Sequence, residues 1–271
     1  MAYTHSIISG SSTNYNDSKL NCLNNAAAKL AEYGFNFTVL TYNIGYFTLN
    51  ASGHNTVYII IYFESSSSYY YSYVRKSVPT SSDYKSDCGI YSIHYGVYNF
   101  STSNYTMNNT TVYTASLGVG KLETNDGDVF AYIGLPNYVY SNIAPFSVGY
   151  VNVKTYRFGD GKAYLWGMYL SNSSESRFNI LFNPNGYIAN ISYSSYMQSA
   201  IPSNVDGIML RHGSFSIGVY NGTTGDEFGN AGMLRNIYYG FCSTISLNIN
   251  AIYVIDNIRY LFLGGQYFLK L

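Results

Sequence analysis

The chain has 271 residues, 47% of them apolar, and its 14 basic and 14 acidic side chains leave no formal net charge. Charged residues make up only 10% of the chain, against about 25% in an average globular domain, and the 33 tyrosines carry much of the polar character. This balance excludes disorder driven by charge repulsion. It also argues against nucleic-acid binding, because no basic surface is present to displace counterions from a phosphate backbone.

The first predicted element is an amphipathic helix over residues 17–34. Asp17 or Ser18 is placed to cap its start, and Gly34 is placed to end it. Four apolar residues recur near helical spacing, namely Leu20, Leu23, Ala27 and Leu30. The preceding residues 1–16 are polar and have no secondary-structure period, so we expect an N-terminal arm that is flexible or docks on a partner.

Signals for β-strands dominate from residue 35 to the C-terminus. Phe35, Phe37 and Val39 alternate with polar residues, so the first strand is expected to lie against the helix. Turn-forming residues separate pairs of β-rich runs and predict hairpins between 46–49 and 56–63, 151–156 and 163–170, 178–182 and 187–193, and 252–255 and 258–263. The expected fold is mainly β, with antiparallel sheets arranged like a β-sandwich and one N-terminal amphipathic helix packed on the first sheet.

Residues 17–271 are expected to form one continuous β-rich body. No Pro-rich linker, charge run or fixed-period repeat divides them. Residues 80–114 are rich in Ser, Asn and Thr, and we expect short strands with wide loops there. The longest apolar run, residues 57–63, is far shorter than the roughly 20 residues of a membrane helix, so it predicts a buried strand and no membrane insertion.

No pattern assigns a catalytic, cofactor-binding or metal-binding residue, so we predict that the protein is not an enzyme. The four histidines never pair at metal-ligand spacing, and no nucleophile elbow or phosphate-binding loop is present. Asn125-Asp126-Gly127-Asp128 would suit calcium but lacks a downstream bidentate glutamate, so we interpret it as a solvated turn. The remaining enzymatic alternative is a cell-wall hydrolase that uses two carboxylates from the set Glu64, Glu123, Asp160, Glu175, Asp226 and Glu227.

The cysteines and the N-terminus indicate where the chain is made. Cys22, Cys88 and Cys242 are an odd number at wide spacing, which favours free thiols in a reducing cytoplasm. Residues 1–12 lack the positive start and the apolar run of a secretory signal. We therefore expect synthesis in a cytoplasm without export through a secretory signal.

Tyrosines concentrate at Tyr69, Tyr70, Tyr71 and Tyr73, in a run that predicts a strand. The odd-numbered rings would share one face, with Tyr70 on the other. A first interpretation puts one face in the core and leaves the other as a sheet surface. Because tyrosine joins a large apolar ring to a hydrogen-bonding tip, a subunit interface and a glycan-stacking platform are the alternatives, and the four residues are our candidates for both.

The layout of the chain resembles uncharacterised virion proteins of tailed bacteriophages. The similarity lies in a short polar opening, one helix ending at Gly34, and Tyr-, Ser- and Asn-rich strands, above all residues 69–75 and the closing hairpin 252–260. It implies a non-enzymatic structural component of the tail, baseplate or collar, made in the host cytoplasm and located in the virion. Its expected partners are other virion proteins and copies of itself. A receptor- or glycan-binding virion protein that uses exposed tyrosines is the alternative.

Overall fold

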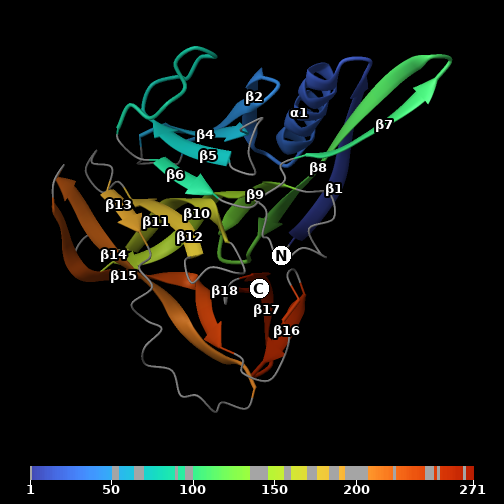
Figure 1. The fold of residues 1–271 in the computed structure, drawn as a ribbon. Coiled ribbons are helices and arrows are strands. Elements are labelled where there is room, and N and C mark those ends of the chain that lie inside the picture. Colours follow the sequence, from blue (N-terminus) through green and yellow to red (C-terminus); the bar gives the residue numbers. More distant parts are fainter. Residues whose placement is uncertain are drawn as a thin grey trace.

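The computed structural model describes residues 2–50, 55–63, 70–88, 91–94, 100–134, 146–155, 160–169, 176–182, 189–192, 207–221, 224–241, 247–248, 251–264 and 267–271. These residues form one helix and two antiparallel sheets (Figure 1). The prediction of a mainly β fold with an N-terminal helix is therefore confirmed.

Sheet B has five strands and sheet A has 13. In sheet B they are β2 (Asn36–Thr41), β3 (Ile44–Leu49), β4 (Val57–Phe63), β5 (Tyr70–Arg75) and β6 (Tyr91–His94), paired in that order. In sheet A they are β1 (Ala2–Ser12), β7 (Ser101–Met107), β8 (Thr110–Glu123), β9 (Val129–Gly134), β10 (Phe146–Thr155), β11 (Asp160–Tyr169), β12 (Ser176–Phe182), β13 (Ala189–Ser192), β14 (Met209–Asn221), β15 (Thr224–Phe241), β16 (Ile252–Ile255), β17 (Ile258–Gly264) and β18 (Tyr267–Lys270).

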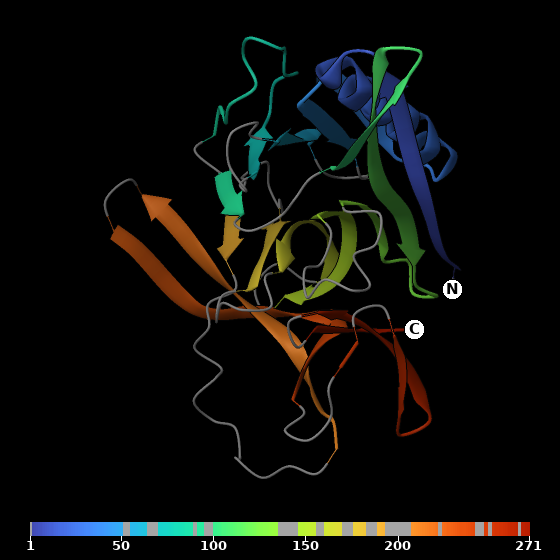
Figure 2. The ribbon, with the colours of Figure 1, turned by 45° about the vertical axis from the view of Figure 1, so that its right-hand side comes forward.

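Sheet A curls back on itself. Its order is β1-β8-β9-β10-β11-β12-β13-β14-β15-β18-β17-β16, and β7 lies beside β8. Strand β10 also pairs with β15, where Val153 lies opposite Leu234, so the strands from β10 to β15 return to their starting point. Figure 2 shows this curl at the centre of the molecule, with the long strands β14 and β15 beneath it.

Helix α1 (Tyr15–Glu32) starts two residues before the predicted range 17–34, and its capping residue lies three residues before Asp17. The side chain of Asn14, rather than Asp17 or Ser18, accepts the backbone N–H groups of Asn16 and Asp17. At the other end, Gly34 has a φ of 87° and stops the helix as expected. The buried side chains of the helix pack toward strands β1, β2 and β8.

Residues 2–12, expected as part of a flexible or partner-docking N-terminal arm, instead form β1. This strand pairs with β8 from Ala2 opposite Glu123 to Ser12 opposite Tyr113. Local pattern did not reveal it because its side chains are small and mostly exposed, and because its partner lies about a hundred residues further along the chain. The backbone ladder, and not an apolar stripe, places the strand in the sheet.

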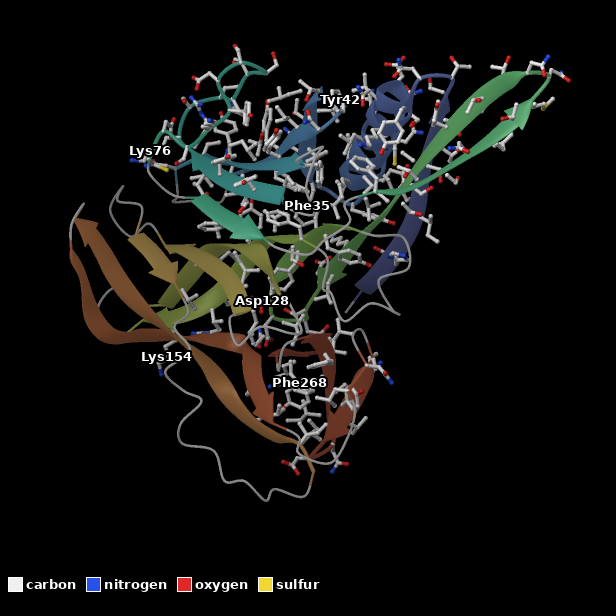
Figure 3. The ribbon with its side chains drawn as sticks, in the orientation of Figure 1. Phe35, Tyr42, Lys76, Asp128, Lys154 and Phe268 are labelled. Carbon is white, nitrogen blue, oxygen red and sulfur yellow. The ribbon has the colours of Figure 1, made fainter. Side chains whose placement is uncertain are left out.

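The main core lies where α1, the inner face of sheet B and sheet A meet. Its fully buried members include Leu23, Leu30, Phe47, Ile59, Leu117 and Trp166. A second cluster joins Tyr132 to Tyr260, Phe262 and Phe268 of the C-terminal strands. Figure 3 labels Phe35 in the first cluster and Phe268 in the second.

Two tyrosine hydroxyls join the sheets at the edge of the main core. The backbone N–H of Asn50 donates to Tyr150 Oη at 2.9 Å, and Tyr164 Oη donates to the carbonyl of Asn55 at 2.9 Å. Both tyrosines belong to the neighbouring strands β10 and β11 of sheet A, whereas Asn50 and Asn55 flank β3 and β4 of sheet B. The two sheets are therefore held together by polar bonds as well as by the core.

The predicted hairpin pairings of β3 with β4, β10 with β11, β12 with β13 and β16 with β17 are confirmed. In the last hairpin Asp256 and Asn257 have φ of 51° and 63°, the left-handed conformation that both residues tolerate. Turns over residues 51–54, 156–159 and 183–188 lie outside the described residues.

The structure also contains long strands that the sequence pattern did not predict. Strands β7 and β8 are joined by Asn108-Asn109, whose φ values of 49° and 60° suit a two-residue hairpin turn. Strands β14 and β15 pair from Met209 opposite Phe241 to Asn221 opposite Thr224, with register shifts. Sequence reasoning missed β7 because all of its side chains are exposed, and a strand with two exposed faces needs no apolar alternation.

Candidate functional site

Three of the four tyrosine candidates, Tyr70, Tyr71 and Tyr73, belong to β5. Tyr69 lies outside the described residues, and only the backbone of Tyr70 is described. Tyr71 and Tyr73 are half-buried on one face of sheet B, whereas Ser72 and Val74 are fully buried on the other. The alternation expected for a strand therefore directs Tyr71 and Tyr73 away from the main core.

Other tyrosines from neighbouring elements join Tyr71 and Tyr73 on that outer face. We call this set the aromatic face; it consists of Tyr46, Tyr58, Tyr62, Tyr71, Tyr73 and Tyr84. The rings of Tyr71 and Tyr73 are nearly parallel, with centroids 6.1 Å apart, and Tyr62 lies 6.0 Å from Tyr71 across the strand pair. Ile44 and Ile60 are buried beneath the rings.

The segment 76–88, which we call the strap, folds over this face. Tyr84 of the strap packs its ring 5.5 Å from that of Tyr62 and 6.1 Å from that of Tyr73. Ile60 is fully buried although its strand position points it outward. The strap therefore turns part of an exposed sheet surface into a second apolar layer.

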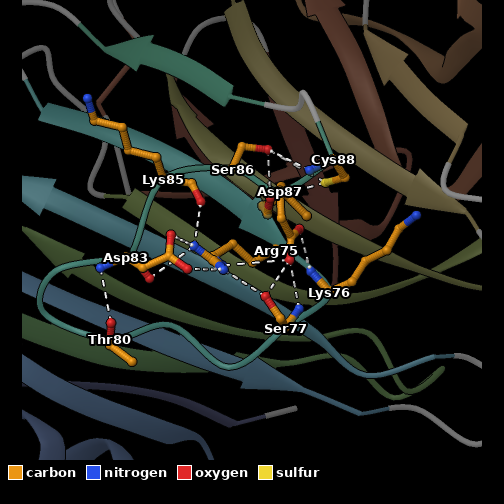
Figure 4. A network of polar contacts seen from close by, with 10 residues as sticks. Arg75, Lys76, Ser77, Thr80, Asp83, Lys85, Ser86, Asp87 and Cys88 are labelled. Carbon is orange, nitrogen blue, oxygen red and sulfur yellow. Dashed lines mark hydrogen bonds and ion pairs between the residues drawn. The ribbon is translucent and has the colours of Figure 1, made fainter.

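A buried arginine at the end of β5 holds the strap (Figure 4). Arg75 Nη1 donates to Asp83 Oδ1 at 2.6 Å and to the carbonyls of Asp83 and Lys85, both at 2.9 Å. Its Nη2 donates to Asp83 Oδ2 at 2.9 Å and to Ser77 Oγ at 2.7 Å. This bidentate fork is the geometry in which guanidinium and carboxylate bind best.

Hydrogen bonds within and to the strap lower the pKa values of two of its carboxylates. The hydrogen bond from Arg75 lowers the pKa of Asp83 from its usual range. Burial acts to raise the pKa of Asp87, but hydrogen bonds from Ser77 and from the Lys76 N–H outweigh it, so that pKa is also lowered. Both groups are therefore ionised at neutral pH, where they can hold the strap to Arg75.

A second surface feature is the tip of the β7–β8 ribbon, residues 101–110, which we call the protruding hairpin. It extends away from the body at the upper right of Figure 1. Every residue in it is exposed, and Tyr105 and Met107 retain 55% and 62% of their accessible surface. No Asp, Glu, Lys or Arg occurs between Asp87 and Lys121. The hairpin therefore presents an uncharged surface with two large apolar side chains.

Asp128, interpreted from sequence as part of a solvated turn, is fully buried, while Asp126 is exposed. Asp128 Oδ1 accepts the Asn152 N–H at 2.5 Å and Asn152 Nδ2 at 2.8 Å, and Oδ2 accepts Asn236 Nδ2 at 2.8 Å. Burial raises the pKa of this carboxyl in spite of these donors. Because amide donors approach both oxygens, the group joins the β8–β9 turn to β10 and β15.

Within the described part of the chain, histidine, cysteine and acidic side chains do not gather in groups of three that would hold a metal ion. Of the carboxylates considered for hydrolysis, Glu123 pairs with Lys121 at 2.9 Å. Glu64 and Glu175 lie outside the described residues, as do the side chains of Asp160, Asp226 and Glu227. No helix among the described residues is long and apolar enough to span a membrane.

Comparison of the chain with known protein families, with curated proteins and with solved structures gives no match. The surfaces of the molecule are therefore the guide to its function. Sequence reasoning placed Tyr71 and Tyr73 on one face of a strand, but it missed the rings that join them from β4 and the strap, because the register of β4 against β5 decides those contacts. It also missed the protruding hairpin, for which Asn108-Asn109 was the available signal.

Proposed function

We propose that this chain is a non-enzymatic structural component of a tailed-bacteriophage particle, in the tail, baseplate or collar. It acts through contacts with copies of itself and with other virion proteins. The protruding hairpin is the observation that carries this proposal. The assignment to a phage particle comes from the layout of the sequence, which resembles that of virion proteins of tailed phages.

The protruding hairpin needs a partner for physical reasons. Beyond the pairing of Ser12 with Tyr113, β1 no longer flanks β8, so among the described residues the ribbon is two strands wide there. An isolated two-stranded hairpin is marginally stable in water. Burying Tyr105 and Met107 against a neighbour would contribute about 1.5–3 kcal/mol for each fully covered side chain. Interface centres are depleted in charge and enriched in Tyr and Met, which is the composition of this tip.

The free thiols agree with synthesis in a host cytoplasm. Cys22 and Cys88 are unpaired in disulfides, and burial raises the pKa of Cys22 to about 12. Such a thiol stays protonated and unreactive at neutral pH. A cytoplasmic chain that later enters a virion needs no disulfide for its fold.

The test removes the apolar side chains of the protruding hairpin and keeps its β-propensity. Tyr105→Thr combined with Met107→Thr is expressed from the phage genome, and purified particles are assayed by peptide mass spectrometry and imaging. We expect the variant to fold with an unchanged Tm and to be lost from particles. Ile7→Thr, at another exposed apolar site on β1, is the matched control. Incorporation of the double variant at the level of the unmodified chain would contradict the proposal.

The aromatic face supports a second candidate, a glycan-binding virion protein. The half-buried rings of Tyr62, Tyr71 and Tyr73, inclined to one another by 27° and 8°, form a row of amphipathic rings that suits sugar stacking. Tyr84 and the strap already cover part of that row, which favours the structural role. A glycan screen decides between them: saturable binding that Tyr71→Ala abolishes supports the second candidate, and a blank screen removes it.

A further inference from the structure

Strand β16 forms an open margin of sheet A. It is the last strand in the sheet order, and among the described residues it pairs only with β17. Its side chains Ile252 and Val254 are 43% and 67% exposed. Figure 1 shows β16 at the outer side of the lower part of the molecule, far from the protruding hairpin.

The opposite margin of the sheet is covered, whereas the described residues supply no such cover along the edge of β16. At β1, helix α1 covers the edge: Asn25 Nδ2 donates to the carbonyl of Ser9 at 2.8 Å, and Asn21 Nδ2 donates to that of Ser11 at 3.1 Å. Proteins usually protect edge strands with such cover, with charge or with proline. The sequence of β16, Ile-Tyr-Val-Ile, contains neither charge nor proline.

The hydrogen-bond phase of the β16–β17 ladder shows which backbone groups are available. Phe262 N–H donates to the carbonyl of Ala251 at 3.0 Å, so residue 251 points its backbone groups toward β17. In an antiparallel ladder this direction alternates from residue to residue. The N–H and C=O groups of Ile252 and Val254 therefore point to the open side, and the same two residues carry the exposed apolar side chains.

We infer that β16 pairs with β16 of a second copy of this chain, antiparallel and around a two-fold axis at Tyr253. In this register Ile252 of each copy lies opposite Val254 of the other. The outward backbone groups of both residues then meet as hydrogen-bonded pairs, and both exposed side chains lie on the same face of a continuous sheet. If the two strands were shifted by one residue, backbone groups that point to the open side would lie opposite groups that point toward β17, and these hydrogen bonds could not form.

The absence of like charges agrees with a second copy as the occupant, and the short length of β16 makes the pairing weak. Residues 243–255 contain no charged side chain, so the carboxylate of Asp256 meets no like charge from them across the axis. A four-residue strand buries much less than the about 800 Å² per partner of a standard stable interface. The pairing is therefore concentration-dependent in solution and is reinforced where other contacts hold the copies together.

The first experiment measures self-association of the full chain by sedimentation velocity from about 10 μM to about 1 mM, the range in which weak interfaces are populated. We expect a monomer–dimer equilibrium whose association constant falls at least about tenfold in Val254→Lys, because a lysine on an edge strand opposes pairing. Val78→Lys is the matched control, since Val78 is 60% exposed and lies in the strap. It is expected to associate like the unmodified chain.

The second experiment tests the register by disulfide trapping. In this pairing the Cα atoms of residue 252 and of residue 254 in the second copy are about 5.5 Å apart, within disulfide reach. Ile252→Cys combined with Val254→Cys is expected to yield an oxidised dimer above the level of the unmodified chain, whereas Val254→Cys alone is not. Efficient trapping by the single variant would overturn this register.

Two results would overturn the self-pairing itself: a chain that stays monomeric at about 1 mM, or a Val254→Lys variant that associates like the unmodified chain. Failure here is distinguishable from failure of the proposed function. If Tyr105→Thr with Met107→Thr abolishes particle entry while Val254→Lys changes neither association nor entry, the structural role stands and the β16 pairing falls.

Discussion

Gly10 is the position where a single methyl group would test the packing of α1 on β1 most directly. A Cβ added there would lie 2.2 Å from the backbone nitrogen of Cys22 and 2.6 Å from the carbonyl carbon of Asn21. Ordinary van der Waals contact begins at about 3.4 Å, so the helix backbone must move away by more than 1 Å. A backbone atom cannot rotate aside as the end of a flexible side chain can.

The expected destabilisation has two parts. Overpacking of a filled core costs about 1–3 kcal/mol. A helix displaced from β1 also weakens the bonds from Asn21 and Asn25 to the β1 carbonyls, at about 1 kcal/mol each. We therefore expect Gly10→Ala to reduce the free energy of unfolding by about 3–5 kcal/mol, which corresponds to a fall in Tm of about 5–9 °C for a chain of this size.

Thermal unfolding followed by circular dichroism, with urea titration as a second measurement, checks this expectation. Ile7→Thr on the same strand is the control, because Ile7 is 57% exposed and its change is expected to stay within about 0.5 kcal/mol. A Gly10→Ala variant whose Tm matches that of the control would refute the close approach of α1 to β1.

Three further changes test other parts of the structure. In Asp128→Asn the new side-chain NH₂ group faces an Asn amide donor that the carboxylate accepted in the original chain, so two donors meet and a hydrogen bond is lost. We expect the unfolding free energy from urea titration at pH 7 to fall by about 1–3 kcal/mol. Burial raises the pKa of Asp128, so the folded state holds this proton more tightly than the unfolded chain does. The resulting stabilisation is fully present below the ordinary pKa near 3.8 and is lost as pH rises through the raised value. In a pH series, the Asn variant should lack this fall of the unfolding free energy with rising pH. Arg75→Met is expected to raise amide hydrogen exchange across residues 76–88, whereas Lys76→Met, at the exposed neighbour, leaves it unchanged. Asn257→Val places a branched side chain at a φ of 63° and should cost about 1–2 kcal/mol by thermal unfolding, with Asn257→Gly as the neutral comparison.

Features that depend on neighbouring residues could be predicted from the sequence. The helix and its end at Gly34, the turn at Asp256-Asn257 and the shared face of Tyr71 and Tyr73 all follow from local rules of backbone conformation and side-chain periodicity. These rules are enough to predict the mainly β class and the position of Tyr71 and Tyr73 in the aromatic face. They act over a few residues, where the chain itself keeps the interacting groups close.

Other features depend on which distant segments meet. The pairing of β1 with β8, the fork from Arg75 into the strap, and the burial of Asp128 among Asn152 and Asn236 join groups from separate strands or across a folded loop. Asp128 shows why local pattern misled: an acidic turn residue is normally solvated, and only the approach of β10 and β15 supplies the amides that permit its burial. The sequence by itself determined the helix, the turn at Asp256-Asn257 and the strands of the predicted hairpins. The tertiary structure decided the pairing partners, the covered and open edges, and which polar groups are buried, because those depend on long-range registry that short-range preferences do not encode.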